Sequence, residues 1–346
     1  MLRNNLIIAW RNLMRHRLHT AINLAGLGLG MAFCLLAWRF ASQEWSFDRF
    51  HSKADRVYRV YVEYMGSARQ VRYADVIDLA FAPELEALSP HVERTVRLKA
   101  TRRSNRYVRT TFAGSSRDEE FLLADPAFFE VFDFPLLLGD AATALAERNS
   151  VVLSHEMAQR LFGDADPLGQ RLAITSMWNR TKTEDFTITG VAAPVPRTSS
   201  IQFNMLLPFD NAEFLVHDWP DEWDGSCDVF ILLAPEADPA DLAPALAQVT
   251  QIWLQHRETI PEALAEGASA FHLQPLIDMR SDTGLLPAYG HGVIEPRDPY
   301  ISYVLVSIAL AVLLMGCINF VNLAIGRTSL RAAEVGVRKA VGAGRG

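Results

Sequence analysis

Two long stretches of the sequence carry no charged side chain. Residues 18–38 and residues 299–326 contain no lysine, arginine, aspartate or glutamate. A transmembrane helix needs about 20 mostly apolar residues to cross the hydrocarbon core of a bilayer, and both stretches reach that length. The pattern therefore predicts two transmembrane helices, at residues 18–41 and 301–326.

Each stretch has an alternative interpretation. The first could be a signal peptide, because basic residues precede it, but its apolar run is long and no small-residue cleavage site stands before Arg39. The second could be a buried core helix, but its length and the arginines that follow it favour a membrane span.

Between the two spans the pattern is that of a mixed α/β domain. Strands are expected in β-branched and aromatic runs at residues 57–64, 92–99, 106–112, 151–153, 186–191, 202–207, 229–233 and 271–276. Helices are expected at residues 75–88, 155–162 and 239–256. Ser154 precedes the second helix as an N-cap, and Asp238 with Pro239 opens the third.

The order of these elements predicts two subdomains in residues 42–300. A strand–helix–strand unit lies near each end of this region, and the two units together would form one discontinuous subdomain. Residues of about 118–225 would then be inserted as a second subdomain. The predicted fold class is an α-helical membrane protein with a large two-subdomain α/β domain outside the cytoplasm.

Three features within or beside the spans are typical of membrane helices. Residues 1–17 predict an amphipathic helix on the membrane surface, with basic and apolar side chains at helical spacing. Gly26 and Gly30 form a GxxxG motif, which lets another helix approach closely. Asn319 and Asn322 are polar positions near the end of the second span that need partners, which other membrane helices would supply.

The charge distribution sets the orientation. The chain has 346 residues and a formal net charge of −7. This negative charge argues against a nucleic-acid-binding protein, because such proteins usually carry a basic surface. Residues 1–19 hold four basic residues and residues 327–346 hold five, whereas residues 42–300 hold 23 basic and 39 acidic residues. The positive-inside rule then places both ends in the cytoplasm and residues 42–300 outside it. In a Gram-negative bacterium this means a multi-pass protein of the cell inner membrane with residues 42–300 in the periplasm.

No catalytic, cofactor-binding or metal site is predicted. His155 and Glu156 begin a zinc-protease pattern, but Gln159 stands where the second histidine ligand belongs. Calcium ligands could come from an acidic cluster beside Trp219 and Trp223, whose members are Asp218, Asp221, Glu222, Asp224 and Asp228. Their spacing does not match an EF-hand, so a solvated acidic loop is favoured.

An ordered set of motifs resembles the FtsX-like, MacB-type permeases of ABC transporters. The motifs before residue 61 are Trp10–Leu13, Asn23–Leu27, Glu44–His51 and Ala54–Val60. Those in the middle are Asp125–Phe132, Asn149–Ser154, Leu161–Asp164 and Asp166–Gly169. The last two are Asn319–Ala324 and Arg331–Arg345. The resemblance covers almost the whole chain, and the order of the motifs is more specific than any one of them.

The resemblance implies a permease subunit that transmits ATPase-driven motion to a periplasmic domain, for export or envelope defence. Because the chain has no nucleotide-binding motif, the ABC ATPase is expected on a separate cytoplasmic partner. A second permease subunit or repeat and a periplasmic adaptor protein are the other implied partners, with the lipid bilayer around the spans. Since the family has four membrane helices per unit, the chain is expected to be the N-terminal part of a longer protein.

Residues 327–346 resemble the coupling segment of the family, which meets the ATPase. This resemblance places Glu334, Arg338, Lys339 and Gly342 at or beside that contact. Glu334 and Arg338 stand four residues apart and can pair on one face of a helix.

Two other functions stay open at this point. One is an FtsX-like regulator of periplasmic cell-wall hydrolases, which differs from an exporter only in its partner. The other is a two-span receptor with a periplasmic sensor domain. A receptor needs a long signalling helix after its second span, and residues 327–346 are short and contain four glycines.

Overall fold

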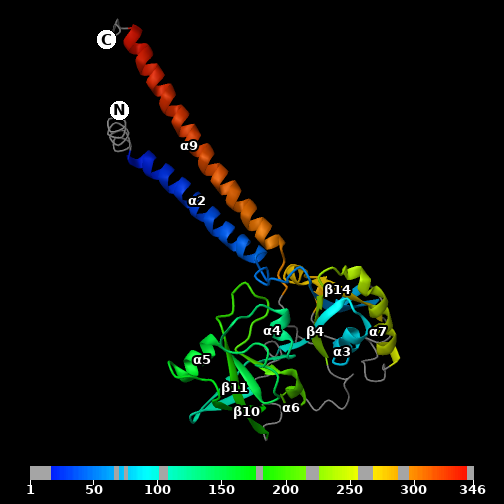
Figure 1. Cartoon of the computed structure of the whole chain (residues 1–346). Coiled ribbons are helices and arrows are strands. Elements are labelled where there is room, and N and C mark those ends of the chain that lie inside the picture. Colours follow the sequence, from blue (N-terminus) through cyan, green and yellow to red (C-terminus); the bar gives the residue numbers. More distant parts are fainter. Residues whose placement is uncertain are drawn as a thin grey trace. The chain divides into compact units, whose positions relative to one another are not determined.

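Figure 1 shows the computed structural model of the chain. The structure describes residues 17–65, 70–73, 77–100, 108–176, 182–215, 226–255, 268–286 and 296–340. The chain divides into two compact units, which are called here the membrane unit and the outer domain. The membrane unit comprises Met1–Trp45 and Pro299–Gly346, and the outer domain comprises Ser46–Asp298.

The described part of the membrane unit is a pair of long helices, α2 (Arg17–Trp45) and α9 (Tyr300–Ala340). Each contains a stretch long and apolar enough to cross a membrane, Leu24–Trp45 in α2 and Tyr300–Asn322 in α9. Most large apolar side chains of these stretches are exposed within the chain, as expected of helices that face lipid or other membrane helices. Helix α9 continues without a break beyond the predicted span, so the segment after residue 326 is helical as far as Ala340.

The outer domain is built on one continuous 15-stranded sheet in its described part. The strands before residue 140 are β1 (Val57–Met65), β2 (Gln70–Tyr73), β3 (Ile77–Asp78), β4 (Val92–Ala100), β5 (Val108–Phe112), β6 (Ser115–Glu119), β7 (Leu122–Ala124) and β8 (Leu136–Gly139). The later strands are β9 (Ser150–Ser154), β10 (Arg171–Ser176), β11 (Thr183–Ala192), β12 (Met205–Pro208), β13 (Ser226–Leu233), β14 (Ala268–Pro275) and β15 (Leu285–Leu286).

Short helices complete the domain. The α-helices are α3 (Phe81–Leu88), α4 (Phe128–Val131), α5 (His155–Phe162), α6 (Ala212–Leu215) and α7 (Ala243–Gln255). The 3-10 turns among the described residues are η1 (Phe209–Asn211), η2 (Pro239–Leu242) and η4 (Leu276–Asp278). Two predicted caps are confirmed: Ser154 accepts a hydrogen bond from the Met157 backbone N–H, and Asp238 forms a capping box with Asp241.

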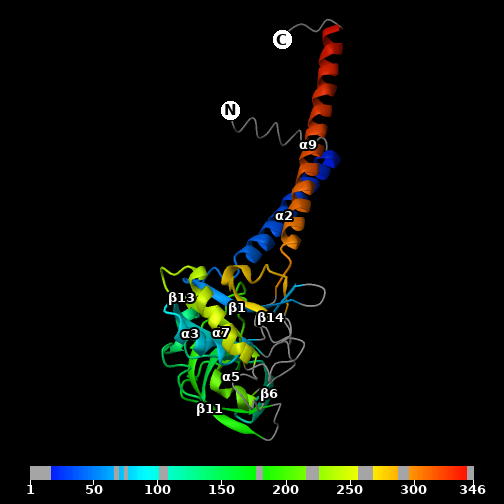
Figure 2. The ribbon, with the colours of Figure 1, turned by 90° about the vertical axis from the view of Figure 1, so that its right-hand side faces the viewer.

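The two strand–helix–strand units interleave in space. Strand β1 lies between β14 and β13, and β13 also pairs with β4, so the order is β14–β1–β13–β4 with all three pairings antiparallel. Helices α3 and α7 contact each other, and Figure 2 shows both beside these strands. The first and last parts of the domain therefore form one sheet, although more than 100 residues separate β4 from β13 in the sequence.

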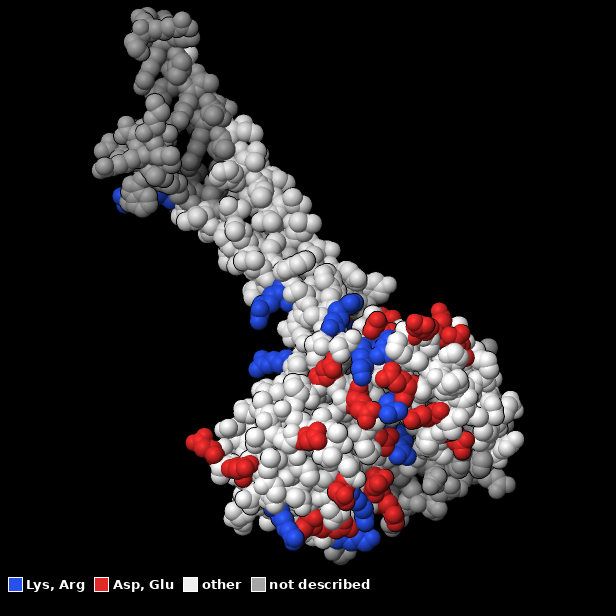
Figure 3. Space-filling model, viewed as in Figure 1, with Lys and Arg blue, Asp and Glu red and all other residues white. Residues whose placement is uncertain are grey.

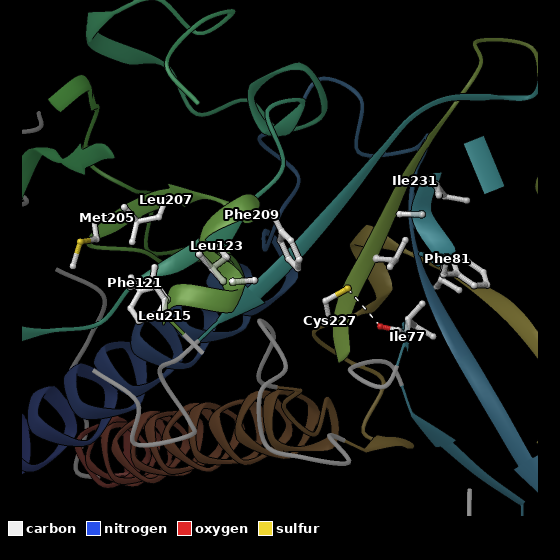
Figure 4. Packing of buried hydrophobic residues seen from close by; sticks show 14 of the residues in the cluster. Ile77, Phe81, Phe121, Leu123, Met205, Leu207, Phe209, Leu215, Cys227 and Ile231 are labelled. Atoms are coloured by element: carbon white, nitrogen blue, oxygen red, sulfur yellow. Dashed lines mark hydrogen bonds between the residues drawn. The ribbon is translucent and has the colours of Figure 1, made fainter. Parts of the chain in front are cut away.

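Both faces of this sheet are covered. Along β13, Val229, Ile231 and Leu233 belong to one buried hydrophobic cluster, and Phe230 and Leu232 belong to another. Successive side chains of a strand point to opposite faces, so an unbroken apolar run needs packing on both sides. Figure 4 shows part of the first cluster, with the thiol of Cys227 directed at the carbonyl of Ile77.

The subdomain boundaries stay a prediction. The first cluster joins Phe81 and Trp253 with Phe186, and the second joins Val57 with Phe128. Each cluster thus contains residues from inside and outside the predicted insert at 118–225.

Three expectations from the pattern need correction. The helix expected at residues 75–88 begins only at Phe81, because Ile77 and Asp78 form strand β3 against β13. Pro83 lies in the first turn of α3, where a missing N–H leaves no helical hydrogen bond unmade. The strand expected at 202–207 begins at Met205. Asp228 is not part of a solvated loop, since it is 1% exposed in β13 and its carboxylate pairs with Arg59 at 3.4 Å.

Candidate functional site

The segment Ser46–Lys53, called here the junction segment, connects the end of α2 to the sheet of the outer domain. It is a series of turns, and Asp48 adopts a left-handed backbone conformation with φ of 56°. Aspartate tolerates this conformation better than most residues. The turn directs the Asp48 side chain into the domain, where it is 1% exposed.

Asp48 attaches the junction segment to the loop before β12. Its backbone N–H donates to the carbonyl of Thr198 at 2.8 Å, and its Oδ1 accepts a hydrogen bond from the Ser200 N–H at 2.7 Å. Burial raises the pKa of the Asp48 carboxyl, against hydrogen bonds from Ser200 and the charge of Arg280, which lower it. These contacts join parts of the chain about 150 residues apart.

His51 attaches the same segment to the loop after α4. Its Nδ1 accepts a hydrogen bond from the Asp133 backbone N–H at 3.0 Å, and the Asp133 carboxylate accepts one from the Ser52 N–H. Burial lowers the pKa of His51 to about 4, although the charge of Asp133 acts in the opposite direction. The imidazole is therefore neutral at pH 7, with its proton on Nε2.

Aromatic side chains surround this contact. The His51 ring lies 4.0 Å from that of Phe50, 5.5 Å from that of Phe132 and 5.3 Å from that of Phe134, measured between ring centroids. The ammonium of Lys53 donates to the Glu130 carbonyl at 2.7 Å. The three rings cover the His51 imidazole, which is 3% exposed, whereas the Lys53 bond lies at the surface.

A third contact leads toward the start of α9. The guanidinium of Arg280 lies 4.3 Å from the ring centroid of Phe47, and the Arg280 carbonyl accepts a hydrogen bond from the Arg297 N–H at 2.7 Å. Phe47 follows α2 and Arg297 precedes α9 in the sequence. Within the outer domain, Arg280 therefore contacts both the segment that follows the first span and the segment that precedes the second.

The membrane unit has its own close contact, at the predicted GxxxG motif. A Cβ atom added at Gly30 would lie 3.5 Å from the Cα of Leu313, and one added at Gly316 would lie 3.6 Å from the carbonyl oxygen of Gly26. The thiol of Cys34 donates to the Ala309 carbonyl at 3.1 Å. Gly26 and Gly30 thus lie where α2 contacts α9 of the same chain.

A profile of the MacB-like periplasmic core domain matches residues 20–249, about two thirds of the chain. The chain belongs to this family. The MacB-like domain is periplasmic, and with its two candidate spans the chain is a membrane protein. The family is a component of transporter permeases, which agrees with the expectation that the chain is not an enzyme. No curated protein sequence matches the chain.

Two solved structures are similar to part of the MacB-like chain. A domain of a candidate permease from Porphyromonas gingivalis is 25% identical, with a TM-score of 0.51 over 65% of this chain and 91% of that one. The periplasmic region of MacB from Actinobacillus actinomycetemcomitans is 12% identical, with a TM-score of 0.43 over 64% of this chain and 90% of that one.

The remaining predicted residues of this MacB-like chain lie partly outside the described structure. Glu334, Arg338 and Lys339 belong to the backbone of α9, and Gly342 lies beyond the described residues, as does most of the amphipathic helix at 1–17. The predicted acidic cluster, apart from Asp228, also lies outside them. Among the described residues no group of three or more histidine, cysteine, aspartate or glutamate side chains could hold a metal ion.

The sequence did not predict the junction contacts as a site. The sequence contains the two segments that meet there. The motif Glu44–His51 and the motif Asp125–Phe132 each have charged and aromatic residues side by side. The structure brings these two motifs together, since the rings of His51 and Phe132 lie 5.5 Å apart. Lys53 and Asp133, which follow the two motifs, add hydrogen bonds. Figure 3 shows acidic and basic side chains interspersed over one face of the outer domain, with no single-sign patch marking a site there.

Proposed function

We propose that this chain is a permease subunit of an ABC transporter that transmits ATPase-driven motion to its periplasmic domain, for export or envelope defence. The observation that carries the proposal is the anchoring of the junction segment by two buried side chains, Asp48 and His51. A segment fixed at several points inside the domain has little slack to absorb a displacement of the helix that precedes it.

The three contacts act on different parts of the outer domain. Asp48 holds the loop before β12, His51 holds the loop after α4, and Phe47 contacts Arg280 after η4. These three regions belong to one sheet and its coverings. A force applied at Ser46 therefore acts on three regions of the outer domain at once, and it displaces the sheet instead of unfolding a single loop.

On the cytoplasmic side, the proposal places Glu334, Arg338 and Lys339 of α9 at or beside a separate ABC ATPase, with Gly342 following them. The support is the unbroken course of α9 from Tyr300 to Ala340. An α-helix of 41 residues is about 60 Å long, and a straight helix conveys a displacement along its whole length.

The remaining partners belong to the same proposal. They are a second permease subunit or repeat and a periplasmic adaptor protein. The two spans would cross the bacterial inner membrane with both ends in the cytoplasm, in agreement with the basic residues at both ends of the chain.

The experiment uses the complete transporter reconstituted with its ATPase, with an environment-sensitive dye on Glu236→Cys, an exposed position of the outer domain. ATP should change the dye emission in the parent protein. The variant Asp48→Ala should still hydrolyse ATP but lose most of the emission change. Asp48→Asn, which keeps an acceptor oxygen, should retain it, and Glu213→Gln at an exposed site serves as control. A full emission change in Asp48→Ala would refute the role of the junction.

A further inference from the structure

The strand β8 presents apolar side chains to solvent on the outer domain, far along the chain from the junction segment. Leu137 is 53% exposed and Leu138 is 39% exposed. They are the only large apolar residues of the described outer domain with such exposure. Strand β8 pairs with β11 through Leu136, Leu138 and Gly139, so its backbone is fixed while the side chains of Leu137 and Leu138 stay uncovered.

One hydrogen-bonding edge of β8 is free of other described strands. Within the described part of the sheet β8 pairs only with β11, at Gly190–Ala192, just beyond the point where the pairing of β11 with β10 ends. Gly139 makes this approach possible, because a Cβ atom at its position would lie 2.3 Å from the Thr189 carbonyl oxygen. An open strand edge is a template for an added strand.

A groove of about 430 Å³ is lined by both leucines of β8, by residues of α5 and by Val191 of β11. Its apolar surface comes from Leu137, Leu138, Ala158 and Val191, and its described lining residues include no lysine or arginine. The volume falls in the range of ligand sites in proteins, about 300–1000 Å³. The groove can therefore take apolar side chains of a chain laid along β8.

The end of the groove is acidic. Asp164 and Asp166 follow α5 in an exposed turn and line the groove with its apolar residues. Asp166 also accepts a hydrogen bond from the Leu168 N–H at 3.0 Å. Among the described residues, the carboxylate of Asp164 has no hydrogen-bond or ion-pair partner.

We propose that β8 and this groove bind an extended polypeptide segment with apolar and basic side chains, which adds to the sheet as a strand. Its backbone would pair with the free edge of β8, its apolar side chains would cover Leu137 and Leu138, and a lysine or arginine would meet Asp164 and Asp166. Backbone pairing supplies affinity in this mode, and the side-chain pockets supply specificity.

The test uses the full chain in detergent and two labelled heptapeptides, one of alternating lysine and leucine and one of alternating glutamate and leucine. Fluorescence anisotropy should show binding of the basic peptide only. Leu137→Thr with Leu138→Thr, which keeps strand propensity, should weaken binding at least tenfold. Asp164→Asn with Asp166→Asn should weaken it roughly threefold to tenfold, because exposed ion pairs contribute up to about 1 kcal/mol each.

Two controls separate this site from the general acidity of the domain. The variant Glu213→Gln with Glu236→Gln removes the same charge from exposed positions elsewhere and should leave the affinity unchanged. A peptide N-methylated on alternate residues, made in both registers, should bind more weakly in one register, because that register removes the donors facing β8.

Several results would overturn the proposal. Equal weakening by the Glu213 and Glu236 control would show only long-range attraction between opposite charges. Equal binding of the acidic peptide would remove the charge complementarity. Self-association that disappears in the Leu137 and Leu138 variant would show that the edge pairs with a second copy. Weaker binding of that variant than of the parent to neutral phosphatidylcholine vesicles would show that the two leucines contact lipid instead.

Discussion

His51 Nδ1 accepts a hydrogen bond from the backbone N–H of Asp133, a residue 82 positions further along the chain, at 3.0 Å. An imidazole that accepts at Nδ1 must be neutral, with its single proton on Nε2. The bond therefore ties the segment after α2 to the loop after α4 only while His51 stays unprotonated. This makes the contact sensitive to acid.

The first prediction concerns that sensitivity. Because burial lowers the pKa of His51 to about 4 from its ordinary 6.5, the unfolded chain binds more protons than the folded chain between these values, and stability falls as pH falls through this window. The loss is complete near pH 4 and amounts to roughly 3 kcal/mol. Urea unfolding at pH 7, 5.5 and 4.5 should show this slope, and His51→Asn should remove much of it.

His91→Asn is the matched control, because the His91 side chain is exposed, and it should keep the slope of the parent protein. The raised pKa of Asp48 acts with the opposite sign, since the folded chain binds the extra proton and gains stability on acidification below the folded value. The same acid slope in parent and His51→Asn would show that His51 is not the group responsible.

How far the sequence predicts this fold depends on the range of the contacts. Strand β13 was predicted correctly because five consecutive apolar residues, Val229–Leu233, are typical of a strand that is buried on both faces. The start of α3 was predicted wrongly because the competing partner of Ile77 is Cys227, 150 residues away. The order of polar and apolar residues around Ile77 does not identify a partner that lies so far along the chain.

The junction contacts escaped prediction for the same physical reason. Asp48 and Ser200 are 152 residues apart, and nothing near Asp48 in the sequence identifies its partner. Burial of a polar residue is also invisible in a pattern that treats polar residues as exposed. Gly30, in contrast, belongs to a local motif that can be seen in the sequence. Its role in helix packing stays a prediction, and the backbone of Leu313 lies near it.

The second prediction uses that glycine. Gly30→Leu should separate α2 from α9, because a Cβ atom would already be in van der Waals contact with Leu313 Cα at 3.5 Å, and the leucine side chain extends beyond it. Gly28→Leu should not, since a Cβ atom there meets nothing within 4 Å. The measurement is the rate of disulfide formation between Cys34 and Ala309→Cys, in a background with Cys317 replaced by alanine. Equal rates in both leucine variants would contradict this helix contact.

The third prediction concerns Gly139. Its φ of 94° and the 2.3 Å approach of the Thr189 carbonyl oxygen to an added Cβ atom both exclude a side chain. Gly139→Ala should lower the free energy of unfolding by roughly 2–5 kcal/mol. Gly114→Ala has a similar φ of 79° but open space around it, so it should cost only about 1–2 kcal/mol. Equal losses on urea unfolding would mean that the close approach to β11 is not the cause.

The fourth prediction addresses the proposed ATPase contact. In the complete transporter, Glu334→Arg and Arg338→Glu should each uncouple ATP hydrolysis from movement of the outer domain, while membrane insertion stays normal. The double exchange should recover part of the loss if the two side chains pair four residues apart on α9. Normal coupling in both single variants would leave these residues as membrane-surface anchors.

The most direct test of force transmission is the hydrogen exchange of three junction amides through the ATPase cycle. They are the N–H of Asp48, bonded to the Thr198 carbonyl, the N–H of Ser200, bonded to Asp48, and the N–H of Asp133, bonded to His51. Mass spectrometry of the complete transporter, without nucleotide and trapped with ATP and vanadate, should find the same slow exchange in both states. Fast exchange of these amides in either state would show slack between the first span and the outer domain and would contradict the account.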